Sequence, residues 1–356
     1  MSTAQSGSPE STPDQLVTIA IPTFNRASRL ADCVLAALSQ TYQRFEVLVS
    51  DNASTDETAE LLRQFRDPRL RVVRQKSNIG LLPNWNACLA EARGEYIVFV
   101  SDDDRIQPWM LGRCIALVKR EPQIPIVLTL SDIHWTEDGR TRQASPNSKF
   151  GTGIWDGADL LLEFFKGNIV VQMCSIMIRT HALCAIGGFP IDLPSYGADI
   201  AAWASLLAKG RAGFVNESCA TFFVHNTNES FRLTMEERLC DERMLTNFIA
   251  NMANCTIEDL RRRRQVALGA ELYFRRRLIS ALCFYRGKEG GKMPEVRRLI
   301  WRWRHDLWHI GIVEVFRLAR LIAVIFFPQL RQLKAWINRL ICSEQLRIRG
   351  SAPLKR

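Results

Sequence analysis

The sequence lacks two glycine-rich motifs that bind phosphate in many α/β proteins. No GxGxxG follows the first apolar segment, and GxxxxGK[ST] occurs nowhere in the 356 residues. These absences exclude a Rossmann dinucleotide site and a P-loop, because each needs glycines where the backbone approaches the phosphates. A nucleotide bound by this chain would need its phosphates neutralised by a metal ion instead.

Cysteine patterns typical of zinc modules are also missing. The ten cysteines include no CxxC pair and no zinc-ligand spacing, which excludes a structural zinc site of the usual kinds. Cys33, Cys88 and Cys114 lie in apolar, periodic segments. We therefore expect reduced core cysteines in a cytoplasmic protein.

Long uncharged apolar runs are absent as well. No stretch reaches the 18 residues that indicate a membrane-spanning helix. Residues 1–15 are rich in Ser, Thr, Pro and Gln, with no basic start and no apolar core. We expect a disordered tail there and not a signal peptide.

Positive charge is scarce in the first two thirds of the chain. Residues 1–230 hold 21 Lys/Arg and 25 Asp/Glu, whereas residues 231–356 hold 26 and 12. Such an asymmetry predicts a domain boundary near residue 230. We expect a main domain over residues 16–230 and a basic, all-helical region over residues 231–356.

Residues 299–327 form the most apolar part of this basic region. Their pattern predicts a helix with a wide apolar face and a narrow polar stripe, which carries Glu314, Arg317 and Arg320. Three tryptophans lie near its start: Trp301, Trp303 and Trp308. The apolar face either lies on an anionic membrane surface or packs on the main domain or a second subunit.

Apolar strands alternate with amphipathic helices through the first hundred residues. We predict strands at residues 16–21, 45–52, 70–75 and 95–100, with a helix between each pair. Ser28 is expected to cap the first helix, residues 54–57 to form a capping box for the second, and Gly94 to close the third. This alternation predicts βαβ units and a parallel sheet.

Polar and acidic residues follow each predicted strand. The strand ends carry PTFNR, SDNAS, QKSNIG and SDDD, and ligands of open parallel sheets bind beyond these carboxyl ends. The three consecutive carboxylates, Asp102, Asp103 and Asp104, repel one another and raise one another's pKa. A divalent cation is the commonest partner of such a cluster, so the sequence predicts a ligand and metal site at this edge.

Five motifs in order resemble the family 2 glycosyltransferases, whose fold is called GT-A. They are VTIAIPTFNR, VLVSDNASTDET, SNIGLLPNWNACLAEARGEYIVFVSDDD, SIMIRTHALCAIGGF with YGADIAAWASLLAKGRAGFV, and TFFVHNTNES. The resemblance covers residues 16–230. It implies a mainly parallel central sheet flanked by helices, with a nucleotide-binding half (16–104) and an acceptor-binding half (105–230).

The resemblance also implies roles in donor binding. Asp51 would accept hydrogen bonds from the nucleobase, and the other nucleotide-binding positions are Pro22, Thr23, Phe24, Asn25, Arg26, Asn78, Gly80, Asn84 and Asp102. Asp103, Asp104 and His225 would hold a Mg²⁺ or Mn²⁺ ion that bridges the diphosphate, which is the oxygen-rich ligation that these hard cations prefer.

On the acceptor side, the resemblance implies that Asp199 is the general base. The remaining acceptor or sugar contacts would be Gly187, Gly188, Phe189 and Trp203. Two positions depart from the family pattern. Ser101 stands where many members have their first acidic residue, and Ala198 replaces the acid that commonly precedes the base.

The function implied is metal-assisted transfer of a sugar, with inversion, from a nucleoside-diphosphate sugar to a glycan or lipid-linked acceptor in cell-surface polysaccharide or O-antigen-type synthesis. The protein would be cytoplasmic, with peripheral contact to the inner face of the membrane through residues 299–327.

A sugar-nucleotide pyrophosphorylase is an alternative, but PTFNRASRL lacks that class's glycine- and lysine-rich loop. A basic nucleic-acid-binding protein is a second, although an acidic ligand edge repels phosphate, so we expect no nucleic-acid partner.

Overall fold

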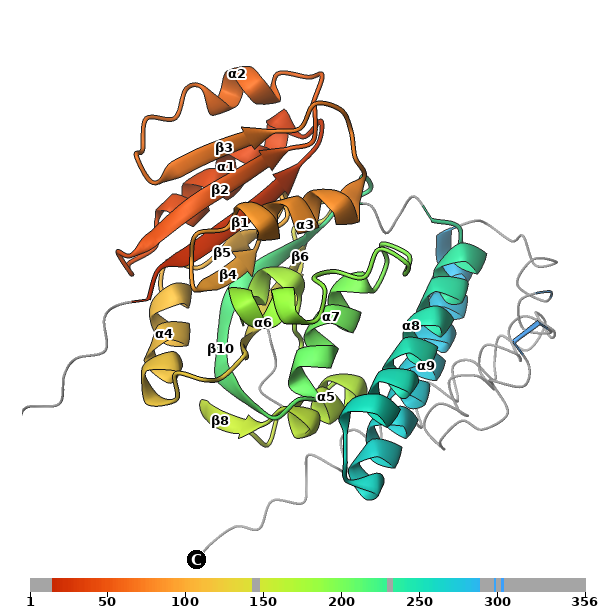
Figure 1. Cartoon of the computed structure of the whole chain (residues 1–356). Helices are drawn as coiled ribbons and strands as arrows, with labels where there is room; N and C mark the ends of the chain where they lie inside the picture. The colour runs from red at the N-terminus through yellow and green to blue at the C-terminus, as the bar shows by residue number, and fades with distance from the viewer. Residues whose placement is uncertain (1–14, 143–147, 229–232, 289–297, 299–301, 304–356) are drawn as a thin grey trace, which may run out of the picture. The chain divides into compact units, whose positions relative to one another are not determined.

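The computed structural model describes residues 15–142, 148–228, 233–288, 298 and 302–303 (Figure 1). The predicted tail lies outside this part of the chain except for Gln15. The predicted membrane-facing segment lies outside it except for Arg302 and Trp303.

The first half forms four parallel strands joined by helices. The elements are β1 (Val17–Thr23), α1 (Ala27–Leu38), β2 (Phe45–Asp51), α2 (Thr58–Leu62), β3 (Leu70–Arg74), α3 (Leu81–Glu91) and β4 (Tyr96–Phe99). The strands are ordered β3-β2-β1-β4, and each pair is parallel. Helices α1 and α3 cover opposite faces of the sheet (Figure 1). Right-handed crossovers require this, because the chain runs from β1 outward to β3 and then returns to place β4 on the other side of β1.

The second half extends this sheet with strands of both directions. Its elements are β5 (Arg105–Ile106), α4 (Met110–Arg120), β6 (Ile126–Trp135), β7 (Thr141–Arg142), β8 (Gly153–Asp156), α5 (Gly157–Lys166), a 3₁₀ turn (Met173–Ser175), β9 (Ile176–Arg179), α6 (Thr180–Ala185), α7 (Ala198–Leu207) and β10 (Arg211–Val224). Strand β9 is antiparallel to both β4 and β6. The α/β class is therefore confirmed. The parallel pairing is confined to β3-β2-β1-β4 and to the pair β6 and β10, which also run parallel.

Two long helices follow, as the pattern after residue 230 predicts: α8 (Met235–Thr256) and α9 (Leu260–Lys288). The chain divides into two compact units. One comprises Met1–Thr234 with Cys240–Ala270, and the other comprises Met235–Leu239 with Glu271–Arg356. The boundary near residue 230 stays a prediction. In the described residues, no helix combines the length and the apolar character needed to cross a membrane.

The helix ends differ from the sequence-based expectation. A single carboxylate caps two helices: Asp56 Oδ2 accepts from the N–H of Ala27 at 3.1 Å, and its Oδ1 accepts from the N–H of Thr58 at 3.1 Å. Ser28 and the 54–57 segment therefore do not cap in the way predicted, because a side chain between the two helices reaches both. Helix α3 ends at Glu91, before Gly94.

The buried core explains the cysteines. Cys33, Cys88 and Cys114 are buried free thiols, as predicted. Cys33 and Cys114 belong to the main apolar cluster, which packs α1 and α4 on the sheet. Burial raises the pKa of the Cys88 thiol to about 12, so this sulfur stays protonated and unreactive.

Candidate active site at the edge of the parallel strands

The site lies where the strand order reverses between β1 and β4. In open α/β sheets this switch point leaves a crevice at the carboxyl ends of the two strands. Thr23, the last residue of β1, donates its hydroxyl hydrogen bond to Asp102 Oδ2 at 2.7 Å. Thr23 and Asp102, two of the residues predicted to bind the nucleotide, are therefore directly linked.

Asp102 and Asp104 are both buried carboxylates. Burial and the charge of Asp103 together raise the pKa of Asp102 to about 7, against the opposing effect of the Thr23 hydrogen bond. Burial and the neighbouring Asp103 also raise the pKa of Asp104 well above its usual value. Asp104 Oδ1 accepts from the N–H of Phe223 in β10 at 3.0 Å. The protein around these two carboxyl groups therefore does not fully stabilise their ionised, negatively charged forms.

Three donors converge on one oxygen of Asp103. Its Oδ2 lies 3.0 Å from Arg26 Nη1, 2.9 Å from His225 Nε2 and 3.4 Å from Asn228 Nδ2. The N–H of Thr227 donates to His225 Nδ1 at 3.3 Å, so the ring proton lies on Nε2 and points at Asp103. The structure thus brings His225 to a predicted metal ligand across 122 residues of sequence.

The chemistry of this donor set fits Mg²⁺ or Mn²⁺. Carboxylate oxygens suit both ions, and Mn²⁺ also accepts an imidazole nitrogen. Within the described ranges, no three His, Cys, Asp or Glu side chains form a ready-made metal cluster. Such ions are often held by one or two carboxylates together with substrate phosphates, and Asp103 supplies one.

A second group surrounds Asp51 at the end of β2. Its Oδ1 accepts from the N–H of Ser54 at 2.8 Å, and its Oδ2 accepts from Arg74 Nη1 at 2.8 Å. The Asp51 side chain is 1% exposed, whereas that of Arg74 is 47% exposed. Sequence reasoning missed Arg74. The available signal was its position as the last residue of β3, which places it on the same sheet edge.

The loops beyond β1, β2 and β3 are joined to one another by side-chain amides. Asn25 has φ +54°, and its Oδ1 accepts from the N–H of Thr55 at 2.8 Å. Asn78 Oδ1 accepts from Asn52 Nδ2 and from the N–H of Gly80, each at 2.9 Å. Phe24 remains 38% exposed. These loops therefore form one surface that an aromatic ring borders, next to Pro22, which lies within β1.

Asn84 lies below this surface. It is 2% exposed, and it exchanges two hydrogen bonds with Ser50: the Ser50 hydroxyl donates to Asn84 Oδ1 at 2.7 Å, and Asn84 Nδ2 donates to the Ser50 carbonyl at 3.1 Å. The amide thus fastens α3 to β2, and direct contact with a nucleotide has no support in its geometry.

The predicted acceptor loop, residues 186–197 between α6 and α7, is fastened to α3 by Asn86. Its Nδ2 donates to the carbonyl of Phe189 at 2.9 Å, and its Oδ1 accepts from the N–H of Phe189 at 2.8 Å. The Phe189 ring is 1% exposed and packs edge-on against Phe99, with centroids 4.9 Å apart. Phe189 therefore supports the loop from below, and the contact with an acceptor that the resemblance implied has no support in the structure.

Gly188→Ala is expected to destabilise the protein more than Gly187→Ala. Both glycines have positive φ, +77° and +87°, which costs any L-residue about 1–2 kcal/mol. A Cβ at Gly188 would also lie 2.5 Å from Asn86 Oδ1, whereas a Cβ at Gly187 would meet open space. Overlap of this kind adds about 1–3 kcal/mol. Urea unfolding measures the difference, and equal losses for the two variants would contradict the packing seen here.

Trp203 is a core residue of α7. Its ring is 1% exposed and meets Phe164 of α5 edge-on, with centroids 4.8 Å apart. The predicted contact of Trp203 with a sugar therefore also lacks support in the structure, because the ring does not reach the surface. Its packing fixes the helix that carries Asp199.

Asp199 lies in the first turn of α7. Burial raises the pKa of its carboxyl to about 6, against the opposing effect of a hydrogen bond from the N–H of Ile200. A carboxylate with a pKa near the working pH is well suited to accept a proton. Asp199 lies on a helix of the second half of the domain and is not one of the hydrogen-bonded residues around Asp51 and Asp103.

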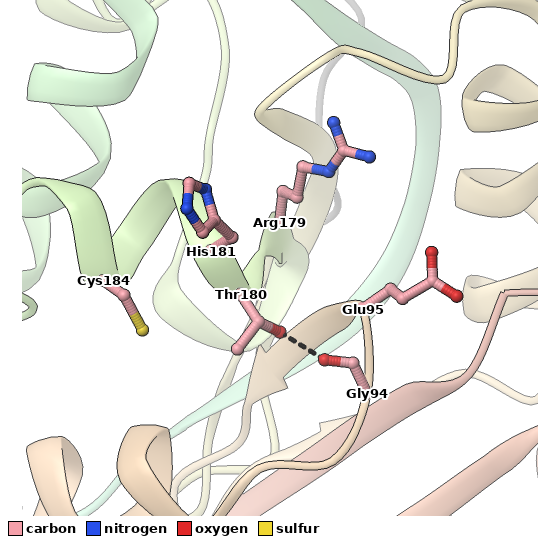
Figure 2. Close-up of a pocket in the computed structure, with 6 residues that line it drawn as sticks. All are labelled: Gly94, Glu95, Arg179, Thr180, His181 and Cys184. Carbon is pink, nitrogen blue, oxygen red and sulfur yellow. Dashed lines mark hydrogen bonds between the residues drawn. The ribbon is translucent and has the colours of Figure 1, made fainter.

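A surface pocket of about 550 Å³ lies elsewhere, before the start of β4 and at the junction of β9 and α6. Its lining residues are Gly94, Glu95, Arg179, Thr180, His181 and Cys184. Figure 2 shows the side chains of Glu95, Arg179 and His181 pointing in different directions. The pocket contains none of the predicted site residues, and it lies at the amino end of β4 whereas Asp102 follows the carboxyl end.

Part of the arginine run after residue 260 is used within the protein. Arg262 Nη1 lies 2.6 Å from Asp159 Oδ1 and 3.1 Å from Asp156 Oδ1. A guanidinium held by two carboxylates is not available to a nucleic-acid phosphate, which weakens that alternative.

Comparison with known proteins supplies the family. The sequence profile described as Glycosyl transferase family 2 matches residues 18–182. The beta-1,3-glucosyltransferase WfaP of Escherichia coli is 33% identical over 197 residues, which cover 55% of this chain and 72% of WfaP. Its full name gives UDP-Glc and alpha-D-GlcNAc-diphosphoundecaprenol as its substrates. The protein MT1568 of Mycobacterium tuberculosis is 28% identical over 214 residues, or 56% of this chain and 64% of its own length.

Solved structures share the fold. TarS of S. aureus (residues 1–349) with UDP-GlcNAc superposes with a TM-score of 0.59 at 17% identity, covering 92% of this chain and 91% of TarS. The mannosyltransferase PcManGT of Pyrobaculum calidifontis with GDP-Man and Mn²⁺ gives 0.55 at 18% identity, covering 98% and 92%. These structures confirm the GT-A fold, and the profile together with WfaP shows that the chain belongs to the family 2 glycosyltransferases.

Proposed function

We propose that this chain moves a sugar from a nucleoside-diphosphate donor to an acceptor hydroxyl, with inversion at the anomeric carbon. One observation carries the proposal: the hydrogen-bonded group at the β1/β4 switch point, where Thr23 holds Asp102 and where Arg26 and His225 hold Asp103. Support comes from two proteins of the same fold, which have UDP-GlcNAc or GDP-Man bound.

In this proposal the donor lies across the carboxyl ends of β1, β2 and β4. For Asp51 to accept from the nucleobase, Arg74 must give up its hydrogen bond to Asp51 Oδ2. The half-exposed Arg74 then offers a donor to the same base. Asp102 faces the ribose. The remaining contacts come from the loops that carry Phe24, Asn25, Asn78 and Gly80, whose amides already fix their shape.

We further propose that Asp103 and His225 would hold a Mg²⁺ or Mn²⁺ ion together with the donor diphosphate. His225 would bind the ion through Nε2 in the other tautomer, in which its proton lies on Nδ1 and Thr227 Oγ1 accepts it. Asp104, the other predicted ligand, is bonded to the backbone of β10. When bound, such an ion acts as a Lewis acid and stabilises the charge of the leaving diphosphate by several kcal/mol. PcManGT, with Mn²⁺ in its structure, supports this use of the acidic edge.

Asp199 is the proposed general base. It removes the proton from the acceptor hydroxyl as that oxygen attacks the anomeric carbon, and the donor's diphosphate leaves from the opposite face. A single displacement of this kind needs one base and no nucleophile from the protein, so the anomeric configuration inverts, by the logic that governs glycosidases.

The proposed acceptor is a glycan or a lipid-linked sugar of a cell-surface polysaccharide. Support comes from WfaP, whose name contains a diphosphoundecaprenol-linked acceptor. A peripheral contact of the predicted helix at residues 299–327 with the cytoplasmic face of an anionic membrane would bring the site to such a lipid.

A thermal-shift screen tests the proposed donor class. UDP-glucose, UDP-GlcNAc, dTDP-glucose and GDP-mannose are each added with Mn²⁺ or with chelator. A ligand at 100 times its Kd stabilises the native state by about 2.7 kcal/mol. We expect donors that carry one of the three nucleobases to raise the Tm by about 5 °C or more with Mn²⁺, and by less with chelator. Free glucose serves as the control. Equal shifts with and without Mn²⁺, or no shift with any donor, would contradict the proposal.

A further inference from the structure

The chain enters α7 under contact from helix α8. Tyr196, three residues before Asp199, donates its hydroxyl to Glu242 Oε1 at 3.0 Å. Glu242 belongs to α8 and is 3% exposed. A hydrogen bond from a hydroxyl to a buried carboxylate is among the stronger ones in proteins, because the charge assists it and water does not compete.

A second contact from α8 lies one residue further on. Gly197 has φ +95°, and a Cβ at this position would lie 2.9 Å from Leu245 Cδ2. Leu245 is 3% exposed, and it lies three residues after Glu242 on the same helix, so both side chains face the same way. Helix α8 therefore holds two consecutive residues of the acceptor loop, Tyr196 and Gly197.

These contacts fix the backbone at the first turn of α7. Gly197 is the N-cap of the helix and Asp199 is its second residue. Further along, the buried ring of Trp203 fixes the same helix against Phe164. With both points held, the carboxylate of Asp199 has little freedom to shift along or around the helix axis.

We propose that Glu242 and Tyr196 are positioning residues for the base, acting through the backbone that carries Asp199. This inference deepens the proposed function and rests on it. It also assigns a role in the reaction to a helix that lies beyond the family match, which ends at residue 182. A base displaced by about 1 Å loses about 100-fold in rate, so the hydrogen bond acts on turnover and not on donor binding.

Tyr196→Phe is the first test. Turnover is measured as the nucleoside diphosphate released from the donor that the thermal-shift screen identifies, with water as the minimal acceptor. We expect kcat to fall about 10- to 100-fold, with the donor KM and the donor-induced Tm shift unchanged. Glu242→Ala should match it. Glu242→Gln keeps an acceptor oxygen for the hydroxyl and should restore kcat to within about threefold of wild type. Tyr42→Phe removes a hydroxyl bonded to the Gln15 carbonyl, far along the sequence, and is the matched control.

The decisive comparison uses Asp199→Asn. Because Tyr196 acts through the base, adding Tyr196→Phe to Asp199→Asn should lower the residual rate no further. A full additional loss in the double variant would show a general structural role and overturn the inference. A wild-type kcat in Tyr196→Phe would overturn it as well. If Tyr196→Phe does not fold, Leu245→Ala relaxes the neighbouring contact and answers the same question. Failure of the proposed function is distinguishable, because the wild-type protein would then release no nucleoside diphosphate from any donor.

Discussion

Asp199→Asn is expected to lower turnover by about 10²- to 10⁴-fold, which is the usual contribution of a positioned general base. The asparagine has nearly the same shape and can still accept the hydrogen bond from the N–H of Ile200, so α7 should begin as it does now. Without a carboxylate, no group at this position takes the proton of the attacking hydroxyl. In the proposed mechanism Asp199 contacts the acceptor hydroxyl and not the nucleotide of the donor, so the donor's effect on the Tm should be unchanged.

The control for this variant is Asp192→Asn. Asp192 is an exposed residue of the same loop, so the substitution changes charge and composition in the same way without touching the first turn of α7. Turnover is measured as nucleoside diphosphate release. Near wild-type turnover in Asp199→Asn, or an equal loss in Asp192→Asn, would show that the base is another group.

The pH dependence of kcat/KM has a defined sign. Burial raises the pKa of Asp199 to about 6, and only the ionised form accepts a proton. Asp102, whose pKa is raised to about 7, titrates in the same range in the wild type and in Asp199→Asn, so the limb due to Asp199 is the difference between the two proteins. We expect this limb to be flat above about pH 7 and to fall about tenfold per unit as the pH decreases below about 6. The residual rate of Asp199→Asn should lack this limb, which separates titration of the base from acid unfolding, since unfolding affects both proteins.

The local pattern of the sequence predicted the parallel half of the fold well. The apolar run at residues 95–100 became β4 (Tyr96–Phe99), and Asp102 follows it at the carboxyl edge. Runs of this kind are informative because a strand covered on both faces must be apolar throughout. The same locality explains the confirmed alternation of strands and helices between β1 and β4.

Interactions between distant segments were harder to predict. The contact of His225 with Asp103 spans 122 residues, and only the family resemblance pointed to it. Asp56 replaced the predicted caps because a side chain that bridges two helices has no local sequence signature. Phe189 and Trp203 read as sugar contacts, but an aromatic residue in a sequence motif supports a site from the core as readily as it lines one.

Asp103→Asn is the second substitution that is expected to have a large effect, because this carboxylate contacts side chains from several parts of the chain. Arg26, His225 and Asn228 all point at its Oδ2, and the neutral amide removes both the negative charge and the best oxygen for a hard cation. Loss of several kcal/mol of stabilisation corresponds to a fall in turnover of about 100-fold or more.

The measurement that isolates this role is the Mn²⁺-dependent part of the donor-induced Tm shift. We expect it to vanish in Asp103→Asn, because the ion then loses its carboxylate and the diphosphate loses the ion. Asp138→Asn is the matched control, since Asp138 is an exposed carboxylate that pairs with Arg140. An unchanged response to Mn²⁺ in Asp103→Asn would move the metal to another ligand. Loss of the response with retained turnover would instead show that turnover does not need the ion.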